Sequence, residues 1–312
     1  QNPFEQEIRK GLGVTFPYNF AKHKKDHSLI KYTPFTNTMI REVAMEALKN
    51  EDLGDDSIPD FLTISFSATD DVGHRFGPRS KEVQDTYLRL DREIANILNT
   101  LDEEVGKGNY IVFLSADHGA TDVPSYMVKN KMPGGYHNRS YIKSMLNEKL
   151  GELFGKEKWV ISVINEQIYL DHNLISSKEL ELTKLKNEVV NILLREDYVT
   201  EAFDSKTVGQ RMFTDPMLIK LQNGYNRKRC GDVLYVLAPS NLNDSYGRQG
   251  TDHRSVYNYD THIPIIFYGT GITPGSTVRL VSITDIAPSI SMLLNISLPN
   301  GSTGTPLMEL FD

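Results

Sequence analysis

The sequence contains very little cysteine: Cys230 is the single cysteine among 312 residues. A chain with one thiol forms no internal disulfide and offers no cysteine-rich zinc site. It also lacks any run approaching the roughly 18 apolar residues of a membrane-spanning helix, so we expect no membrane span. An excess of positive charge is absent as well, because the net charge is −7. A nucleic-acid partner is therefore not expected, since binding the phosphate backbone requires a basic surface.

The composition that remains is ordinary for a globular protein, with 39% apolar and 24% charged residues. A length of 312 residues is sufficient for one large α/β domain or for a domain that carries a sizeable insertion. The order of strand and helix patterns along the chain distinguishes between these two organisations.

The first part of the chain alternates helix and strand patterns. A helix is predicted over 37–49, where apolar residues recur at helical spacing. Asp60–Ser67 and Asn109–Ala116 are short apolar runs rich in strand formers, which is typical of buried strands. The segment Ser80–Glu104 between them has the pattern of a long amphipathic helix. Strand, helix and strand form a βαβ unit, so we expect the two strands to be parallel neighbours.

The middle of the chain is less regular and predicts an inserted subdomain. We interpret 1–120 as a metal-binding α/β core, 121–250 as an accessory α+β subdomain inserted into it, and 251–312 as the return to the core. The expected sheet of the core is mostly parallel and doubly wound. Further helices are predicted over 140–153, 177–194 and 285–294, and further strands over 159–164, 167–170, 232–238, 263–268 and 277–281. Ser282 and Asp285 have the spacing of a capping pair at the start of the last helix.

Two pairs of a carboxylate and an imidazole follow the two predicted strands of the βαβ unit. Asp70 and His74 come directly after the first strand, and Asp117 and His118 come directly after the second. Ligands of open α/β sheets bind at the carboxyl ends of the strands, so we expect both pairs at one edge. A third candidate, His253, lies in a polar loop before a later strand. Oxygen and nitrogen donors of these residue types suit Zn²⁺.

Each of these short patterns is weak by itself. Asp171 and His172 also form an Asp-His step, which we interpret as structural. Asp70 and His74 are four residues apart, so one helical turn brings both side chains to a single ion. Asp117 and His118 are consecutive and serve either one ion or two. The joint placement of the two pairs after paired strands is what favours a metal site.

Several ordered segments resemble the alkaline phosphatase superfamily. FLTISFSATDDVGHRFGP, EVQDTYLRLDREIANIL and GNYIVFLSADHG are similar to the metal-binding core of the type I phosphodiesterase/nucleotide pyrophosphatase group and, within it, of the PafA-like alkaline phosphatases. GTDHRSVYNYDTHIPIIFYG resembles the late histidine segment of that group, and SITDIAPSISMLL resembles its C-terminal helix. The resemblance covers 37–138 and 250–310 and implies an alkaline phosphatase-like fold.

The resemblance implies two zinc ions in the intact active site. One ion would be bound by Asp70, His74 and His253. The other would be bound by Asp117 and His118. A small-molecule phosphate ester would be the substrate.

The late histidine departs from the family pattern. Its ligand lies in a His-Gly step in the family, whereas here His253 is followed by Arg254. His262 is the alternative ligand, but its place against an apolar strand favours a buried structural histidine. His137 matches no ligand position, so a structural role is expected for it.

The resemblance also implies an activity, which is hydrolysis of phosphate monoesters through a phospho-enzyme intermediate. A phosphodiesterase or nucleotide pyrophosphatase is the alternative with the same ligands. The family's Thr or Ser nucleophile and an early Asp ligand match no segment here, so we assign no catalytic residue. We therefore expect the C-terminal part of such an enzyme, with the N-terminal part of the fold missing and that half as a candidate partner. A truncated, inactive metal-binding fragment is a further alternative. The implied location is periplasmic or secreted.

Overall fold

The computed structural model describes residues 2–243 and 249–311, and these fold into two compact units. Unit 1 comprises Gln1–Lys25, Val72–Val83 and His118–His262, and unit 2 comprises Asp26–Asp71, Gln84–Asp117 and Ile263–Asp312. Each unit is thus assembled from three separate stretches of the chain. The division at residues 120 and 250 stays a prediction.

Unit 1 is built around a four-stranded sheet with the strand order β3–β4–β6–β5, in which all ladders are antiparallel. A short parallel pair, β2 with β7, lies apart from it. The strands are β2 (Gly135–His137), β3 (Val160–Ile164), β4 (Gln167–Leu170), β5 (Val199–Asp204), β6 (Val233–Leu237) and β7 (Asn241–Asn243). The helices are a 3-10 helix (Phe20–His23), α4 (Pro124–Lys129), α5 (Arg139–Phe154), α6 (His172–Ser177), α7 (Leu182–Leu193), α8 (Ser205–Gln210), α9 (Pro216–Asn223) and α10 (Asn258–Thr261).

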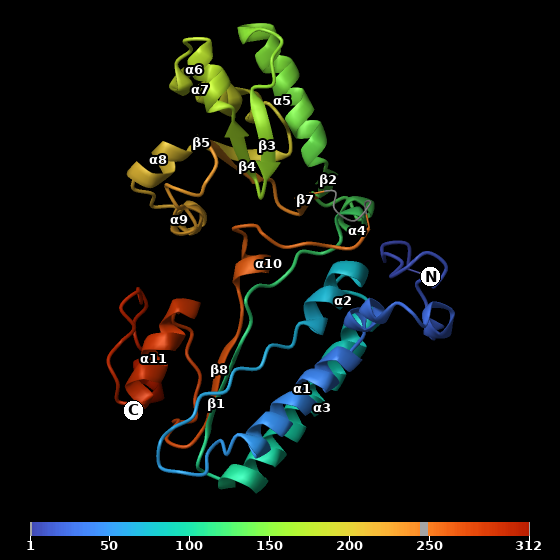
Figure 1. Ribbon diagram of the computed structural model, residues 1–312, viewed down its shortest axis with the longest axis vertical. Coiled ribbons are helices and arrows are strands. Elements are labelled where there is room, and N and C mark those ends of the chain that lie inside the picture. The colour runs from blue at the N-terminus through green and yellow to red at the C-terminus, as the bar shows by residue number, and fades with distance from the viewer. Residues whose placement is uncertain (1, 244–248, 312) are drawn as a thin grey trace. The chain divides into compact units, whose positions relative to one another are not determined.

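Local sequence features explain how two strands of this sheet are connected and how the sheet is covered. Asn165 and Glu166 join β3 to β4 with φ angles of 48° and 57°, as a type I′ hairpin turn requires. Helices α5 and α7 lie beside the sheet (Figure 1). Their apolar faces form a core in which Leu146 and Leu185 are fully buried together with Trp159. The Trp159 indole N–H donates to the Gly155 carbonyl at 2.8 Å, so this large side chain is buried with its polar group satisfied.

Unit 2 contains a helix pair, α1 with α3, and an antiparallel strand pair, β1 with β8, and both pairs are elongated (Figure 1). Ala44, Met45 and Leu48 of α1 pack against Ile97 of α3. Strand β1 pairs with β8 from Ile111↔Gly269 to Ser115↔Ile265. The elements in or entering this unit are a 3-10 helix (His27–Tyr32), α1 (Phe35–Asn50), α2 (Ala68–Phe76), α3 (Lys81–Leu101) with a π-helical turn (Asp102–Gly106), β1 (Ile111–Ser115), β8 (Ile265–Gly269), a 3-10 turn (Ile283–Asp285), α11 (Ile286–Leu293) and a last 3-10 turn (Met308–Leu310).

Most of the predicted elements are confirmed, as is the α/β class. Helices α1, α3 and α5 and strands β3, β4, β6 and β8 lie where the patterns indicated. The predicted cap is present, because Ser282 and Asp285 form a reciprocal capping box before α11. The helix predicted over 177–194 is present as α7 but begins only at Leu182, because Glu179 adopts a φ of 53°, which does not continue a right-handed helix from α6.

The predicted βαβ unit is wrong. Residues 60–67 are not a strand, and Phe61 in this run is 60% exposed. Strand β1 pairs antiparallel with β8 instead. The strand predicted over 277–281 is likewise absent, and Val278 and Leu280 are fully exposed there. An apolar run rich in strand formers becomes a strand only where another segment supplies its hydrogen bonds, and no described residue pairs with either run.

Candidate metal centre

Helix α2 carries two of the predicted ligands one turn apart. It buries Ala68, Val72 and Phe76, each 1% exposed, along one face. Asp70 and His74 lie on another face at i and i+4, where side chains are neighbours. Asp70 also lies in the first helical turn, where the helix dipole favours a negative charge. The proximity of these two side chains is therefore a property of the helix itself.

Hydrogen bonding fixes the orientation of the His74 ring. Its Nδ1 lies 2.8 Å from the carbonyl oxygen of Thr251. A carbonyl only accepts, so Nδ1 carries the proton and the lone pair resides on Nε2, the atom that would bind a metal. Thr251 is itself held, because its N–H donates to the His74 carbonyl at 2.9 Å and its hydroxyl donates to the Thr121 carbonyl at 2.7 Å. Gly250 makes this approach possible, since a Cβ there would lie 2.2 Å from the His74 carbonyl oxygen.

His253 completes a three-residue cluster. Its ring centroid lies 5.2 Å from that of His74, and its backbone N–H donates to Asp252 Oδ1 at 2.9 Å. One candidate ligand atom from each of Asp70, His74 and His253 lies within 4.8 Å of the other two. Zinc with ligand bonds of about 2.1 Å holds its ligand atoms about 3.4 Å apart. One carboxylate and two imidazoles therefore fit a divalent ion of this kind after small side-chain movements.

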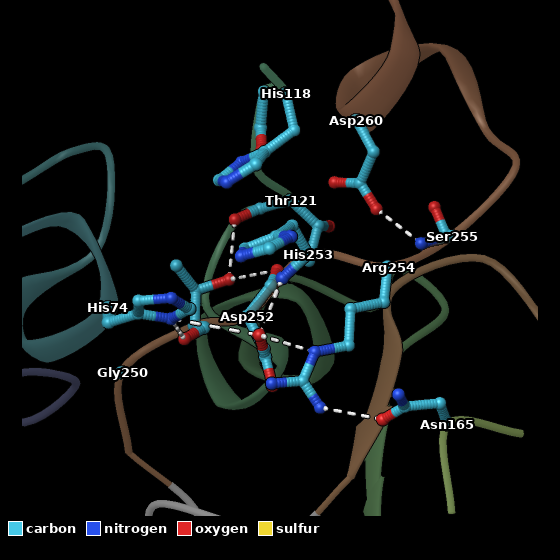
Figure 2. Close-up of polar contacts among 12 residues, drawn as sticks. His74, His118, Thr121, Asn165, Gly250, Asp252, His253, Arg254, Ser255 and Asp260 are labelled. Carbon is cyan, nitrogen blue, oxygen red and sulfur yellow. Dashed lines mark hydrogen bonds and ion pairs between the residues drawn. The ribbon is translucent and has the colours of Figure 1, made fainter. Parts of the chain in front are cut away.

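The other two predicted ligands lie outside that cluster. His118 stacks face to face on His253, with ring centroids 3.3 Å apart and an interplanar angle of 13° (Figure 2). Its Nδ1 lies 2.9 Å from the Gly119 carbonyl, which again assigns the proton to Nδ1 and the lone pair to Nε2. Asp117 is exposed, directly before His118 and two residues after the end of β1. The structure thus brings His118 to His253 but does not place Asp117 in the cluster.

Arg254, the departure from the family pattern, adopts a conformation that favours glycine. Its φ is 106°, which costs a side-chain-bearing residue about 1–3 kcal/mol. Its Nε lies 3.8 Å from Oδ1 of Asp252, a buried carboxylate that also lies 3.8 Å from His74 Nδ1. Its Nη1 donates to Asn165 Oδ1 at 3.4 Å. Arg254 therefore occupies a backbone conformation that glycine adopts more readily than a residue with a side chain.

A cavity of about 230 Å³ lies beside these residues in unit 1. Asp252, His253 and Arg254 line it together with Glu166 and Tyr235. Burial raises the pKa of Glu166, while the charges of nearby arginines oppose this shift.

His137 and His172 have structural partners. His137 Nε2 lies 2.6 Å from Asn241 Oδ1, its ring stacks on Tyr198, and burial lowers its pKa. His172 contacts Asp232 at 2.8 Å, and Asp171 caps α6, as expected of a structural pair. The prediction of a buried His262 is wrong, because His262 is exposed at the end of α10, where the chain has not yet entered β8.

Three residues of this site were not predicted from the sequence. Thr251, Asp252 and Asp260 are 1%, 4% and 3% exposed. Burial raises the pKa of Asp260, and His118 nearby acts in the opposite direction. All three lie in or beside the histidine loop. Thr251 and Asp260 contact residues distant in sequence, His74 and Gly119, so no local pattern could have identified these two.

Known proteins place these observations in context. The family model described as type I phosphodiesterase/nucleotide pyrophosphatase matches residues 6–255. Alkaline phosphatase PafA of Elizabethkingia meningoseptica is 40% identical over 298 residues, which cover 95% of this chain and 54% of PafA. Alkaline phosphatase PhoV of Synechococcus elongatus is 38% identical over 312 residues, which cover 99% of this chain and 55% of PhoV.

A solved structure agrees with the sequence matches. The crystal structure of wild-type PafA matches with a TM-score of 0.92 and 38% identity, and the match covers 100% of this chain and 60% of that one. The alkaline phosphatase-like fold is therefore confirmed. The chain spans about half the length of the curated relatives that it matches. That it is the C-terminal part of such a protein stays a prediction.

Proposed function

We propose that this chain, which belongs to the type I phosphodiesterase/nucleotide pyrophosphatase family, contributes most of the metal site of a zinc-dependent phosphatase. The whole protein would hydrolyse phosphate monoesters through a phospho-enzyme intermediate. The cluster of Asp70, His74 and His253 is the observation that carries this proposal. The names of the relatives PafA and PhoV, both alkaline phosphatases, favour monoesters as substrates.

The ligand set divides into two groups in this proposal. Asp70, His74 and His253 would bind one zinc ion, and Asp117 and His118 would bind a second. Bound zinc ions would stabilise the negative charge of the phosphate oxygens. The chain's own contribution is orientation: the Thr251 carbonyl keeps the proton on His74 Nδ1.

Charge also supports a small anionic substrate. With neutral imidazoles, the first group carries one negative charge, from Asp70, so a divalent ion bound there keeps a net positive charge. A phosphate ester is attracted to that local charge even though the chain as a whole carries −7. We further propose a periplasmic or secreted location. No helix of residues 2–243 and 249–311 is long and apolar enough to cross a membrane.

The decisive test is zinc content by elemental analysis of the wild-type chain and of Asp70→Ala and Asp117→Ala. The cluster as described predicts about one tightly bound zinc ion per chain, lost in Asp70→Ala and retained in Asp117→Ala. Asp71→Ala is the matched control, because Asp71 lies on the same helical turn but outside the cluster. Zinc bound equally by wild type and Asp70→Ala, or no zinc under metal-replete conditions, contradicts the ligand assignment for this chain.

A second candidate is a phosphodiesterase or nucleotide pyrophosphatase, which the description of the matching family model favours. The two candidates predict opposite preferences for p-nitrophenyl phosphate and bis-p-nitrophenyl phosphate in an assay of the whole protein. Faster turnover of the monoester supports the phosphatase, and faster turnover of the diester supports the alternative. If this chain binds zinc but turns over neither compound, it acts by itself as a metal-binding fragment.

A further inference from the structure

Asp260 connects the two segments that carry the stacked histidines. It lies in α10 and is 3% exposed. Its backbone carbonyl accepts a hydrogen bond from the N–H of Gly119, the residue after His118, at 2.7 Å. Its Oδ2 accepts from the N–H of Ser255, two residues after His253, also at 2.7 Å. One residue of unit 1 therefore binds the backbone on both sides of the imidazole pair.

The segment of His118 and the helix α10 pack too closely to admit a Cβ at Gly119. A Cβ at Gly119 would lie 2.2 Å from the backbone carbonyl oxygen of Tyr259, the residue before Asp260. Between His253 and Ser255 the chain passes through Arg254 with its φ of 106°, so the loop has little freedom to adjust by itself. The separation of the two histidine segments is consequently set by their contacts with α10.

The second carboxylate oxygen of Asp260 adds a further observation. Oδ1 is buried and has no hydrogen-bond partner among the residues that the structure describes. Figure 2 shows Asp260 to the right of the histidine pair, with the oxygen that does not contact Ser255 directed toward the side of His118 and His253. A buried polar atom without a partner is costly. The residue is thus poorly explained as a contribution to stability alone.

We propose that Asp260 is a positioning residue for metal binding, which holds His118 and His253 at the separation that the metal site needs. This inference rests on the proposed function, because that function assigns both histidines as ligands. Asp260 acts through the backbone of its neighbours and does not itself bind an ion. What matters in this proposal is an acceptor at the position of Oδ2 rather than the negative charge.

The test compares Asp260→Ala with Asp260→Asn in the full chain, with Zn²⁺ and Co²⁺ as probes. Asparagine keeps an acceptor for the Ser255 N–H, whereas alanine removes it. Competition with a chromogenic chelator should show metal binding weakened about 10–100-fold in Asp260→Ala and by less than about threefold in Asp260→Asn. The visible spectrum of bound Co²⁺ should change in the alanine variant and match wild type in the asparagine variant.

A metal-free measurement separates this inference from the proposed function. Imidazole rings 3.3 Å apart give a proton–proton Overhauser contact between His118 and His253 in the chelator-treated chain. That contact should persist in Asp260→Asn and disappear in Asp260→Ala, whether or not either histidine binds zinc. Asp171→Ala, which removes a helix cap elsewhere in unit 1, controls for a general loss of stability and should retain the contact.

Two results would overturn the inference. Equally weakened metal binding in Asp260→Ala and Asp260→Asn would show that the negative charge, and not the hydrogen-bond acceptor, is what matters. An unchanged contact between the histidines in Asp260→Ala would show that other residues hold them. Should Asp260→Ala fail to fold, Asp260→Asn still decides, because loss of the contact or of the Co²⁺ spectrum in that variant contradicts the proposal. If the wild-type chain binds no metal but still gives the contact between His118 and His253, the proposed function is refuted, and only the positioning of the two histidines by Asp260 stands.

Discussion

The buried carboxyl group of Glu5 predicts a specific dependence of stability on pH. Glu5 is 5% exposed and accepts a hydrogen bond from Asn2 Nδ2 at 2.7 Å. A second buried carboxylate, Glu82, lies near enough to repel it and accepts from the Tyr18 hydroxyl at 2.6 Å. Burial, with added repulsion from Glu82, raises the pKa of Glu5 from 4.5 to about 7. Between about pH 4.5 and pH 7, the folded chain thus keeps a proton on Glu5 that the unfolded chain has released.

The raised pKa of Glu5 sets the direction and the size of the change in unfolding free energy with pH. Stability from the protonated carboxyl is fully present below pH about 4.5 and is lost as the pH rises through about 7. At about 1.4 kcal/mol per pKa unit, the full effect is about 3 kcal/mol, of which about 2.5 kcal/mol falls between pH 5 and pH 8. Glutamine keeps an acceptor for Asn2 but does not titrate. Relative to wild type, Glu5→Gln should therefore gain about 2.5 kcal/mol across that interval.

The assay is urea unfolding at several pH values in excess chelator, followed by fluorescence. Trp159 is the single tryptophan and is fully buried in unit 1, so its emission reports the unit that contains Glu5. Glu152→Gln makes the same charge change at an exposed position of that unit and should run parallel to wild type. If the curves of Glu5→Gln and wild type also run parallel within about 0.5 kcal/mol, the reasoning from burial is refuted.

Three further substitutions give distinct outcomes. Leu146→Ala, at a fully buried core position, should lower the unfolding free energy of unit 1 by about 2–5 kcal/mol, measured in urea. Asp285→Ala removes the acceptor of two backbone N–H groups and should lower the stability of unit 2 by about 2–3 kcal/mol in thermal unfolding, whereas Asp285→Asn should lose less. Gly119→Ala places a Cβ against the Tyr259 carbonyl and should speed zinc release, while Gly275→Ala, with open space around it, should not. Unchanged zinc release in Gly119→Ala would contradict the close approach.

The elements that the sequence predicted well are those whose signal is local. The apolar repeat of α3, the bounds of β4 and the capping pair before α11 each depend on residues a few positions apart. The strand predicted over 60–67 failed for the opposite reason. Its composition suits a strand, but pairing depends on a distant segment, and β1 pairs with β8, which follows it by about 150 residues.

The same distinction applies to the site. Asp70 and His74 were predictable because one helical turn sets their spacing. The contact of His74 with the Thr251 carbonyl joins residues 177 positions apart, and a backbone carbonyl has no signature in the sequence. Asp260 was missed for a similar reason, since its function as an acceptor for Gly119 and Ser255 depends on where α10 packs.

The positive φ of Arg254 has a consequence for how this site can diversify. Replacing the arginine by glycine would relieve backbone strain in the folded state, but it would also give the unfolded chain more freedom, and these two effects oppose each other. Substitutions between the two residues should therefore change stability little. The identity of the side chain at this position can drift or be engineered, and with it the charge at the rim of the cavity beside His253. Position 254 is thus a place where the charge beside His253 can change without rebuilding the loop that carries the histidine.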